Sequence, residues 1–403
     1  MFKPNSLSLI LLGGGLMASG PLSTDMYLPS LPSLAGYFGT SVSLVTWTLS
    51  IYLAGYAVGQ LTYGPVSDRF GRRPALLAGM ALFATASAAC VFAPNIETLI
   101  VARFFQAFGA CSGQVVGRAV IRDLHDREGV TRMLAYTMVI MGLTSTVSPV
   151  IGGLLTVWIG WRSIFALLAV FGLIMAVTVF RTLDESLAKP DPAATRLGPM
   201  VQNFRRLLAN RSFAGYTLSL CFIFGSLFTY LAGSSFVFMG VFGLAPHEFG
   251  FVFTAVGGTS VVGSLLTGRL AKRFEASTMF GFAAAGAAAG SIALVIVSLA
   301  GGGIVAHVLP LTVVTFGLGV MMPAGFAGAL APHPEIAGTA SSLIGFSQSM
   351  FAMVAGSTVG ALFNGTSLPM SAMIAALTVS SLLSFLLVVQ PFRRPAPVPR
   401  PAE

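Results

Sequence analysis

Twelve long apolar runs separated by short polar segments dominate this sequence. A run of about 20 apolar residues is the length that an α-helix needs to cross a hydrocarbon core of about 30 Å. A helix satisfies its own backbone polar groups, which lipid cannot do, and the runs lack the alternation of barrel strands. The sequence therefore predicts an all-α integral membrane protein, with spans at about 7–30, 44–66, 75–94, 97–120, 133–157, 164–182, 213–240, 249–271, 278–300, 304–328, 337–364 and 369–390.

The distribution of charge predicts the orientation of the chain. Only 9% of the residues are charged, against about 25% in an ordinary soluble domain, and the formal net charge is +9. The cations gather in alternate loops, so the positive-inside rule explains the net charge and a nucleic-acid partner is not needed. We expect both termini in the cytoplasm and a multi-pass protein of the bacterial inner membrane. The cytoplasmic cations then comprise Lys3 and those within 69–73, 122–132, 181–211, 269–273 and 393–400.

The polar segment at mid-chain predicts two halves. It carries three prolines and separates six runs from six. The string that begins at Gly64 and ends at Phe70 returns 204 residues later as Gly268 to Phe274, which indicates an internal repeat. Transporters built from such repeats bind substrate near the midplane between them. We expect an N-terminal six-helix bundle (1–182), a cytoplasmic linker (183–211), a C-terminal six-helix bundle (212–392) and a cytoplasmic tail (393–403).

The sequence carries no pattern for a cofactor or for enzymatic chemistry. Its three cysteines fall singly inside apolar runs, and its four histidines lack metal-ligand spacing. There is no nucleotide-binding loop and no catalytic triad signature. We therefore expect no metal, no cofactor and no enzymatic activity.

Asp25 and Arg103 are the main candidates for function. Each lies inside an apolar run, where an ionisable side chain costs several kcal/mol and usually marks a transport pathway. Helix geometry places both at about 10 Å below the outer interface, so they can face one cavity. A carboxylate in such surroundings can take up and release a proton as its environment changes. For Asp25 the alternatives are a static ion pair with Arg103 or a cap on a helix broken near Pro29. For Arg103 the alternative is a purely structural hydrogen-bond donor.

Polar and aromatic side chains near this depth are candidates for the substrate cavity. Gln106 lies one turn from Arg103 on the same helical face. The aromatic residues can contact a drug-like molecule, although positions in the core or facing lipid are common for such side chains. The proposed cavity set is Asp25, Tyr27, Gln106, Tyr136, Phe228 and Tyr230.

The loop after the second run has the most specific string in the chain. Its order of glycine, acid, glycine and paired arginines predicts a tight turn whose charges hold neighbouring helix ends by dipole and ion-pair contacts. Asp123, at the inner end of the fourth run, is the expected partner of Arg72. Simple positive-inside anchoring is the alternative. The set that we call the conformational latch comprises Gly64, Asp68, Arg69, Gly71, Arg72, Arg73 and Asp123.

The fifth run carries a proline and two glycines, Pro149, Gly152 and Gly153. They predict a kinked helix that packs closely against a neighbour. Close packing alone would explain the glycines.

These strings together resemble the major facilitator superfamily. Gly64 to Arg73 is similar to its loop 2–3 motif, Arg103 to Gln106 to its helix-four motif, and Ser148 to Gly153 to its helix-five antiporter motif. The strings around Asp25, Arg122-Asp123-Leu124 and Tyr230 resemble the bicyclomycin and chloramphenicol resistance (Bcr/CflA) branch.

This resemblance implies the major facilitator fold and efflux of small drug-like molecules or antibiotics in exchange for protons, by alternating access. It implies that Asp25 takes protons, that Arg103 supports the cavity, and that Asp68, Arg72 and Asp123 form a cytoplasmic charge latch. The expected partners are a small drug-like substrate, protons and the lipid bilayer, and we expect a monomer. Proton-coupled uptake of a small metabolite is the alternative, because the same fold and acid could serve it.

Overall fold

The computed structural model describes residues 7–389 except 193, 196, 272, 334 and 335, and every element among them is helical. The elements are α1 (Leu7–Asp25), η1 (Leu28–Ser30), α2 (Leu31–Phe38), α3 (Val42–Phe70), α4 (Arg72–Val91), α5 (Ile96–Leu124), α6 (Arg127–Trp158), α7 (Arg162–Thr182), α8 (Leu197–Ala209), α9 (Arg211–Ser235), η2 (Phe236–Val241), α10 (Pro246–Leu270), α11 (Ala276–Leu299), α12 (Ile304–Leu330), α13 (Ala337–Leu362), α14 (Leu368–Ser384) and η4 (Phe385–Val389).

Eleven helices in the described part of the chain are long and apolar enough to cross a membrane. α1 adds a further apolar helix of 19 residues. Most of the long helices coincide with the predicted apolar runs. This confirms the expected fold class, an all-α membrane protein of about twelve spans. The N-terminal lysine Lys3 and the tail 393–403 lie outside the described residues.

The first predicted run is not one helix. We expected a span over 7–30, but α1 ends at Asp25, a short 3-10 turn (η1) follows, and α2 begins at Leu31. Pro29 and Pro32 are the second residues of η1 and α2. Proline has no N–H to donate to the preceding turn, so the α-helix cannot continue through these positions. The break leaves Asp25 as the last residue of α1.

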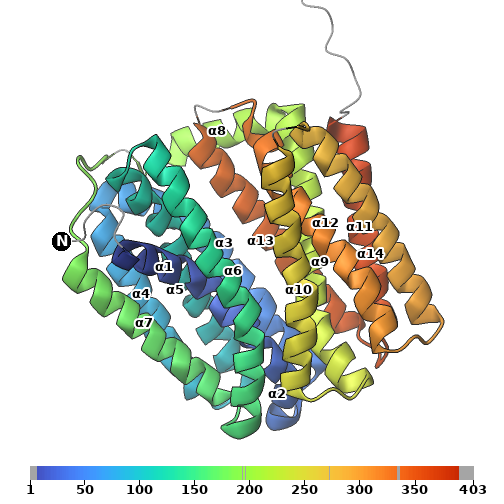
Figure 1. The fold of residues 1–403 in the computed structure, drawn as a ribbon. Coiled ribbons are helices and arrows are strands. Elements are labelled where there is room, and N and C mark those ends of the chain that lie inside the picture. The colour runs from blue at the N-terminus through green and yellow to red at the C-terminus, as the bar shows by residue number, and fades with distance from the viewer. Residues whose placement is uncertain (1–6, 193, 196, 272, 334–335, 390–403) are drawn as a thin grey trace, which may run out of the picture.

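The linker between the halves contains a helix that was not predicted from the sequence. α8 lies across the end of the helices that carries the Arg-rich loops, away from α2 (Figure 1). Phe204 and Leu207, three residues apart, face the C-terminal bundle, and Leu207 is buried there. Arg205 and Arg206 are exposed on the other side of the helix. The linker is therefore an amphipathic helix on the cytoplasmic surface.

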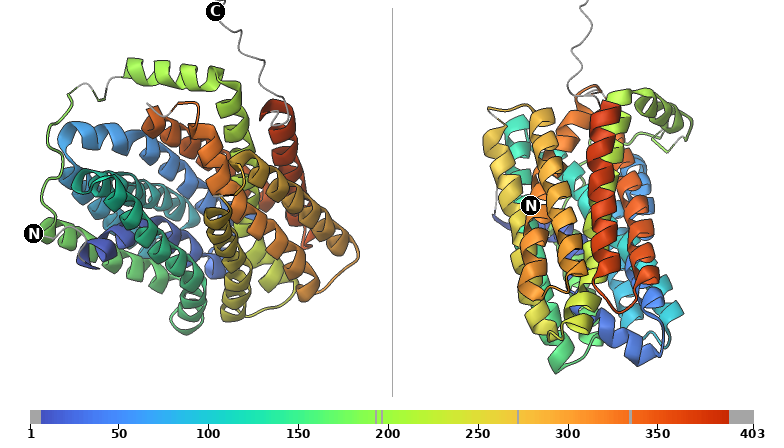
Figure 2. Two further views of the ribbon diagram at one scale, coloured as in Figure 1. Left: turned by 45° about the horizontal axis from the view of Figure 1, so that its top comes forward. Right: turned by 90° about the vertical axis from the view of Figure 1, so that its right-hand side faces the viewer.

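The helices pack in two groups, α1 to α7 and α9 to α14. Figure 2 shows the molecule tipped forward and from the side. In each group a central helix is almost enclosed: α5 packs on α1, α3 and α4, and α9 packs on α12, α13 and α14. Two antiparallel helix pairs, α3 with α13 and α6 with α10, join the groups.

Small residues allow α3 and α13 to approach closely. A side-chain carbon added to Gly360 would collide with Thr46, and one added to Gly356 would lie 3.1 Å from Oγ of Ser50. Nearer the cytoplasm, the side-chain amide of Gln60 lies directly over Gly345. The paired residue numbers sum to 405 or 406, as a continuous antiparallel register requires. This seam therefore extends from the outer end of α3 past its middle.

The seam between α6 and α10 is closed only in its outer half. A side-chain carbon on Gly250 would lie 2.9 Å from the carbonyl oxygen of Pro149, and the Thr254 hydroxyl donates a hydrogen bond to the carbonyl of Thr146 at 2.6 Å. One turn nearer the cytoplasm, no atom lies within 4 Å of a carbon added to Gly142 or Gly258. The two helices converge toward α2 and diverge toward α8 (Figure 1). The structure is thus closed toward the periplasm and open toward the cytoplasm between these helices.

Candidate functional site

Asp25 lies at the broken end of α1 and is the only carboxylate among the buried, described side chains. The Thr24 hydroxyl donates a hydrogen bond to its Oδ1 at 3.1 Å. Ser145 on α6 also contributes a side-chain hydrogen bond to this carboxylate. Two neutral hydroxyls therefore hold Asp25, and no described cation forms an ion pair with it.

The helix-five motif residues stand directly behind Asp25. A side-chain carbon on Gly152 would collide with the carbonyl oxygen of Met26, the residue after Asp25. A carbon on Gly153 would collide with the backbone of Pro246 at the start of α10. The two glycines thus let α6 touch α1 on one side and the C-terminal bundle on another. Pro149 lies one turn earlier, where its carbonyl contacts Gly250.

Arg103 is fully buried inside the N-terminal bundle, where it is held by oxygen atoms and not by a carboxylate. Its Nη1 donates to the carbonyl of Ser23 at 3.1 Å and to Oε1 of Gln106 at 2.6 Å. Its Nε donates to the carbonyl of Thr48 at 3.4 Å. Gln106 in turn donates from Nε2 to Oγ of Ser87 at 2.8 Å. The guanidinium therefore links α1, α3, α4 and α5.

Three aromatic rings surround the same guanidinium. Its central carbon lies 4.6 Å from the ring centroid of Tyr27, 4.3 Å from that of Tyr52 and 5.8 Å from that of Phe165. Aromatic faces attract a cation, and the attraction grows when water is excluded. Nη2 of Arg103 has no hydrogen-bond partner. We name this group, Arg103 with Tyr27, Tyr52 and Phe165, the aromatic cage.

Asp25 and Arg103 do not form the ion pair that the sequence offered as an alternative. The salt bridges among the described residues include neither side chain. Arg103 is nevertheless connected to Asp25 through the backbone of α1, because it donates a hydrogen bond to the carbonyl of Ser23, two residues before Asp25. The Ser23 hydroxyl also forms a short hydrogen bond with that of Tyr52. The alternative of a static pair is therefore wrong for this structure.

The other cavity candidates occupy different surroundings. Tyr27 and Gln106 belong to the buried shell of Arg103 and border no opening. In the C-terminal bundle, Tyr230 stacks on Phe253 with ring centroids 5.5 Å apart, and its hydroxyl has no partner. Phe228 packs on Phe224 at 5.0 Å. Tyr136, on the inner half of α6, is 47% exposed. The structure thus places these candidates in three separate locations: the shell of Arg103, the C-terminal bundle and the inner half of α6.

The latch charges form one network at the cytoplasmic ends of α3, α4 and α5. Arg72 is buried and pairs with Asp68 one turn before it and with Asp123 of α5, whose Oδ2 is 2.9 Å from Nε. Its Nη1 also donates to Oγ of Ser67. Gly71 adopts φ +104°, a conformation that glycine tolerates, and this turns the chain from α3 into α4. The pairing expected between Arg72 and Asp123 is therefore present.

The remaining latch residues face the linker and α7. Arg69 donates to the hydroxyl of Thr195 at 2.7 Å, and Arg73 donates to the carbonyl of Phe180 at 2.7 Å. No atom lies within 4 Å of a carbon added to Gly64, so this glycine is not needed for close packing here.

Two residues in these sites were not predicted from the sequence. Glu185, just after α7, accepts hydrogen bonds from the backbone N–H of Arg72 at 2.9 Å and of Arg73 at 3.2 Å. A carboxylate is favourable at a helix N-terminus, but nothing in the sequence links Glu185 to the start of α4. Ser145, by contrast, could have been found, because it lies one turn before Pro149 on the helix-five motif.

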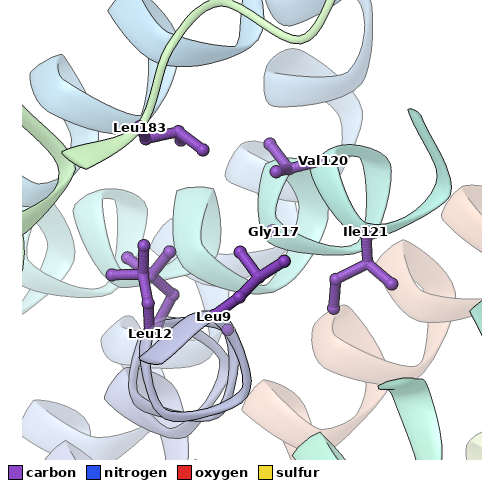
Figure 3. A pocket seen from close by; sticks show the side chains of 8 residues that line it. Leu9, Leu12, Gly117, Val120, Ile121 and Leu183 are labelled. Carbon is purple, nitrogen blue, oxygen red and sulfur yellow. The ribbon is translucent and has the colours of Figure 1, made fainter. Parts of the chain in front are cut away.

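A small apolar pocket lies elsewhere, near the cytoplasmic end of α1 and α5 (Figure 3). Its lining includes Leu9, Leu16, Val120 and Leu183 and has almost no polar surface. Leu16 is nine residues before Asp25, about 14 Å along the helix axis. This pocket is therefore not part of the Asp25 site. Among the residues whose side chains are described, no group of histidine, cysteine, aspartate and glutamate could hold a metal ion.

Two packed helix bundles, with a buried acid and a buried arginine in the N-terminal one, are the arrangement of a membrane transporter. The comparisons with known proteins agree: a family model described as Major Facilitator Superfamily matches residues 14–357. The chain belongs to the major facilitator superfamily. It is therefore a multi-pass transporter of the bacterial inner membrane and not an enzyme.

Three relatives match over most of their length. An "Uncharacterized MFS-type transporter YdgK" of Bacillus subtilis is 33% identical over 94% of this chain and 94% of its own. A "Bicyclomycin resistance protein homolog" of Haemophilus influenzae is 30% identical over 95% and 96%, and the "Multidrug resistance protein D" of Escherichia coli is 29% identical over 86% and 86%. Among solved structures, a D-xylose-proton symporter has a TM-score of 0.73 at 15% identity, covering 95% of this chain and 97% of its own, which shows the shared fold.

Proposed function

We propose that this chain exports small drug-like molecules from the cytoplasm in exchange for protons, with Asp25 as the coupling acid. The names of the resistance-protein relatives support the substrate class. The helix-five motif beside Asp25 supports exchange over uptake. Proton-coupled uptake of a small metabolite remains the second candidate, because the same acid and fold could serve it.

The single observation that carries the proposal is the position of Asp25. It is the only buried carboxylate among the described side chains, and it lies where α1 breaks, against α6. Its two side-chain partners are hydroxyls, which can hydrogen-bond to either its ionised or its protonated form. A proton can therefore bind and leave without breaking an ion pair.

A single proton supplies enough energy for useful export. Moving one charge inward across about 100 mV releases about 2.3 kcal/mol, and one pH unit adds about 1.4 kcal/mol. Since a tenfold change in concentration corresponds to about 1.4 kcal/mol, one-to-one exchange supports a gradient of roughly 500-fold for a neutral solute.

The other site residues take supporting roles in the proposal. Arg103 positions the end of α1 through the carbonyl of Ser23, so a change in the aromatic cage moves Asp25. The latch network holds α3, α4 and α5 together at the cytoplasmic end, and it releases or re-forms as the bundles rock.

The test is drug export by an efflux-deficient bacterium that expresses the chain, its Asp25→Asn variant or the control Glu97→Gln, at matched membrane levels. Glu97 is an exposed acid in the first turn of α5, so its loss changes the net charge equally. We expect protection against phenicols, bicyclomycin or cationic dyes from the wild type and the control, but not from Asp25→Asn.

Everted vesicles separate antiport from the alternative. Drug addition to vesicles that hold a proton gradient is expected to release protons with the wild type and not with Asp25→Asn. Protection by Asp25→Asn equal to that of the wild type would refute the role of Asp25. No protection by the correctly inserted wild type, together with proton-driven uptake of a metabolite, would favour the symporter.

A further inference from the structure

Arg118 is an unpaired cation on the inner half of α5. It lies six residues before the end of this membrane-crossing helix, which is about 9 Å along the axis. None of the ion pairs or hydrogen bonds found among the described residues includes it, and its side chain is exposed. The nearby Arg122, by contrast, lies 4.0 Å from Asp123. Arg118 is therefore available to a solute.

The face of α5 that carries Arg118 does not point to lipid. Gln114, one turn before it, accepts a hydrogen bond from the hydroxyl of Tyr56 on α3 at 2.5 Å. Arg118 is close enough to interact electrostatically with that same hydroxyl and with Cys111, which packs against Gly59 of α3. The lipid-exposed residues of α5, Val101 and Phe105, project from a different face of the helix. Arg118 consequently lies on the α3 side of α5.

Gln60 adds an unpartnered acceptor one turn from Tyr56 on α3. Its Oε1 is buried without a hydrogen bond, and the side chain lies over Gly345 of α13. Beyond this contact the seam opens, since no atom lies within 4 Å of a carbon added to Gly64 or Gly338. These side chains therefore stand where the space between the bundles begins on the cytoplasmic side.

Stacked aromatic rings connect Tyr56 to the Asp25 site. Tyr56 stacks on Tyr52 with centroids 6.4 Å apart and planes 21° from parallel, and Tyr52 belongs to the aromatic cage. Tyr52 is itself buried, bonds to the Ser23 hydroxyl and packs on Arg103, so packed side chains connect Tyr56 to the Asp25 site.

We propose that Tyr56, Gln60, Gln114 and Arg118 form an entry subsite that binds substrate from the cytoplasm before it reaches Asp25. The subsite presents a guanidinium, two side-chain amides and a phenol, and it has no carboxylate. It therefore selects molecules that carry hydrogen-bond acceptors and are neutral or anionic, and it disfavours cations. The inference rests on the proposed drug export and specifies its substrate class.

The test is equilibrium binding to the purified full-length protein in lipid nanodiscs. The probes are chloramphenicol, which is neutral, its hemisuccinate ester, which adds one carboxylate to the same scaffold, and the cation ethidium. We expect the wild type to bind the ester at least as tightly as chloramphenicol, and ethidium more weakly than both.

Three variants test whether Arg118 causes the preference for the ester. Arg118→Gln is expected to weaken binding of the ester about tenfold or more and of chloramphenicol less than about threefold, whereas Arg118→Lys retains most of the preference for the ester. Arg205→Gln removes an exposed arginine from α8 and is expected to change neither affinity. Raising the salt concentration should weaken binding of the ester and not of chloramphenicol, because only the charged contact is screened.

The outcomes separate the two proposals. If the wild type binds the probes and Arg118→Gln leaves the ratio of ester to chloramphenicol affinity unchanged, the entry subsite is wrong and drug export stands. Tighter binding of ethidium than of the ester by the wild type would also overturn the subsite. If the wild type binds none of the three probes, drug export and the subsite fail together.

Discussion

Gly152 of α6 lies against the carbonyl oxygen of Met26, so closely that no side-chain carbon fits between them. This contact fixes the backbone immediately after Asp25, and α6 also brings Ser145 to the carboxylate. The helix-five motif therefore shapes the coupling site itself, in addition to packing the two bundles.

Gly152→Ala is expected to lower the stability of the purified protein by about 2 kcal/mol or more, because the clash is with backbone and not with a movable side chain. Drug export should fall at least tenfold. Gly142→Ala is the matched control on the same helix, since an added carbon there meets no atom within 4 Å. Thermal unfolding and export assays would check both. Equal effects of the two substitutions would contradict a specific contact at Met26.

Arg103→Lys is expected to impair export strongly although the charge is kept. A lysine cannot reproduce the donations to Ser23, Thr48 and Gln106 from a planar group between aromatic rings. Lost hydrogen bonds in a buried site cost about 1–3 kcal/mol each, so stability should fall as well. Thermal unfolding and vesicle transport would measure this. Export at the wild-type rate by Arg103→Lys would show that only the positive charge matters.

Arg72→Ala is expected to destabilise the protein by about 3 kcal/mol, because it leaves Asp123 and Asp68 without their buried partner. Arg122→Ala provides the comparison: its side chain is 64% exposed and only 4.0 Å from Asp123, so its loss should cost less than about 1 kcal/mol. Chemical unfolding in detergent would rank the two. The latch would be unimportant to the fold if both variants unfolded like the wild type.

A pair of cysteines is expected to lock the outer part of the seam between α3 and α13. Oγ of Ser50 is 3.1 Å from a carbon added to Gly356, so cysteines at these two positions can form a disulfide in this structure. Oxidation should stop export, and reduction should restore it. Cysteines at Gly142 and Gly258 should not cross-link in this state, because these positions have no neighbours. Gel mobility after oxidation would report both pairs, and the reverse pattern would contradict the inward-open assignment.

The sequence by itself determined the membrane class, the number of spans and the expected relationship between the halves. Apolar run length and the placement of cations suffice for this, because lipid permits few backbone arrangements. It also singled out Asp25 and Arg103, since charges inside apolar runs are rare, and it anticipated Arg72 beside Asp123. Their functional roles remain predictions.

The tertiary structure decided which of these residues meet. Local sequence could not reveal that α1 ends at Asp25, that Arg103 binds the carbonyl of Ser23 and not the Asp25 carboxylate, or that Glu185 caps α4 from more than 100 residues away. Such contacts join distant helices, and the rotation of each helix about its axis sets them. That rotation follows from side-chain packing across the whole bundle, so a single apolar run does not encode it.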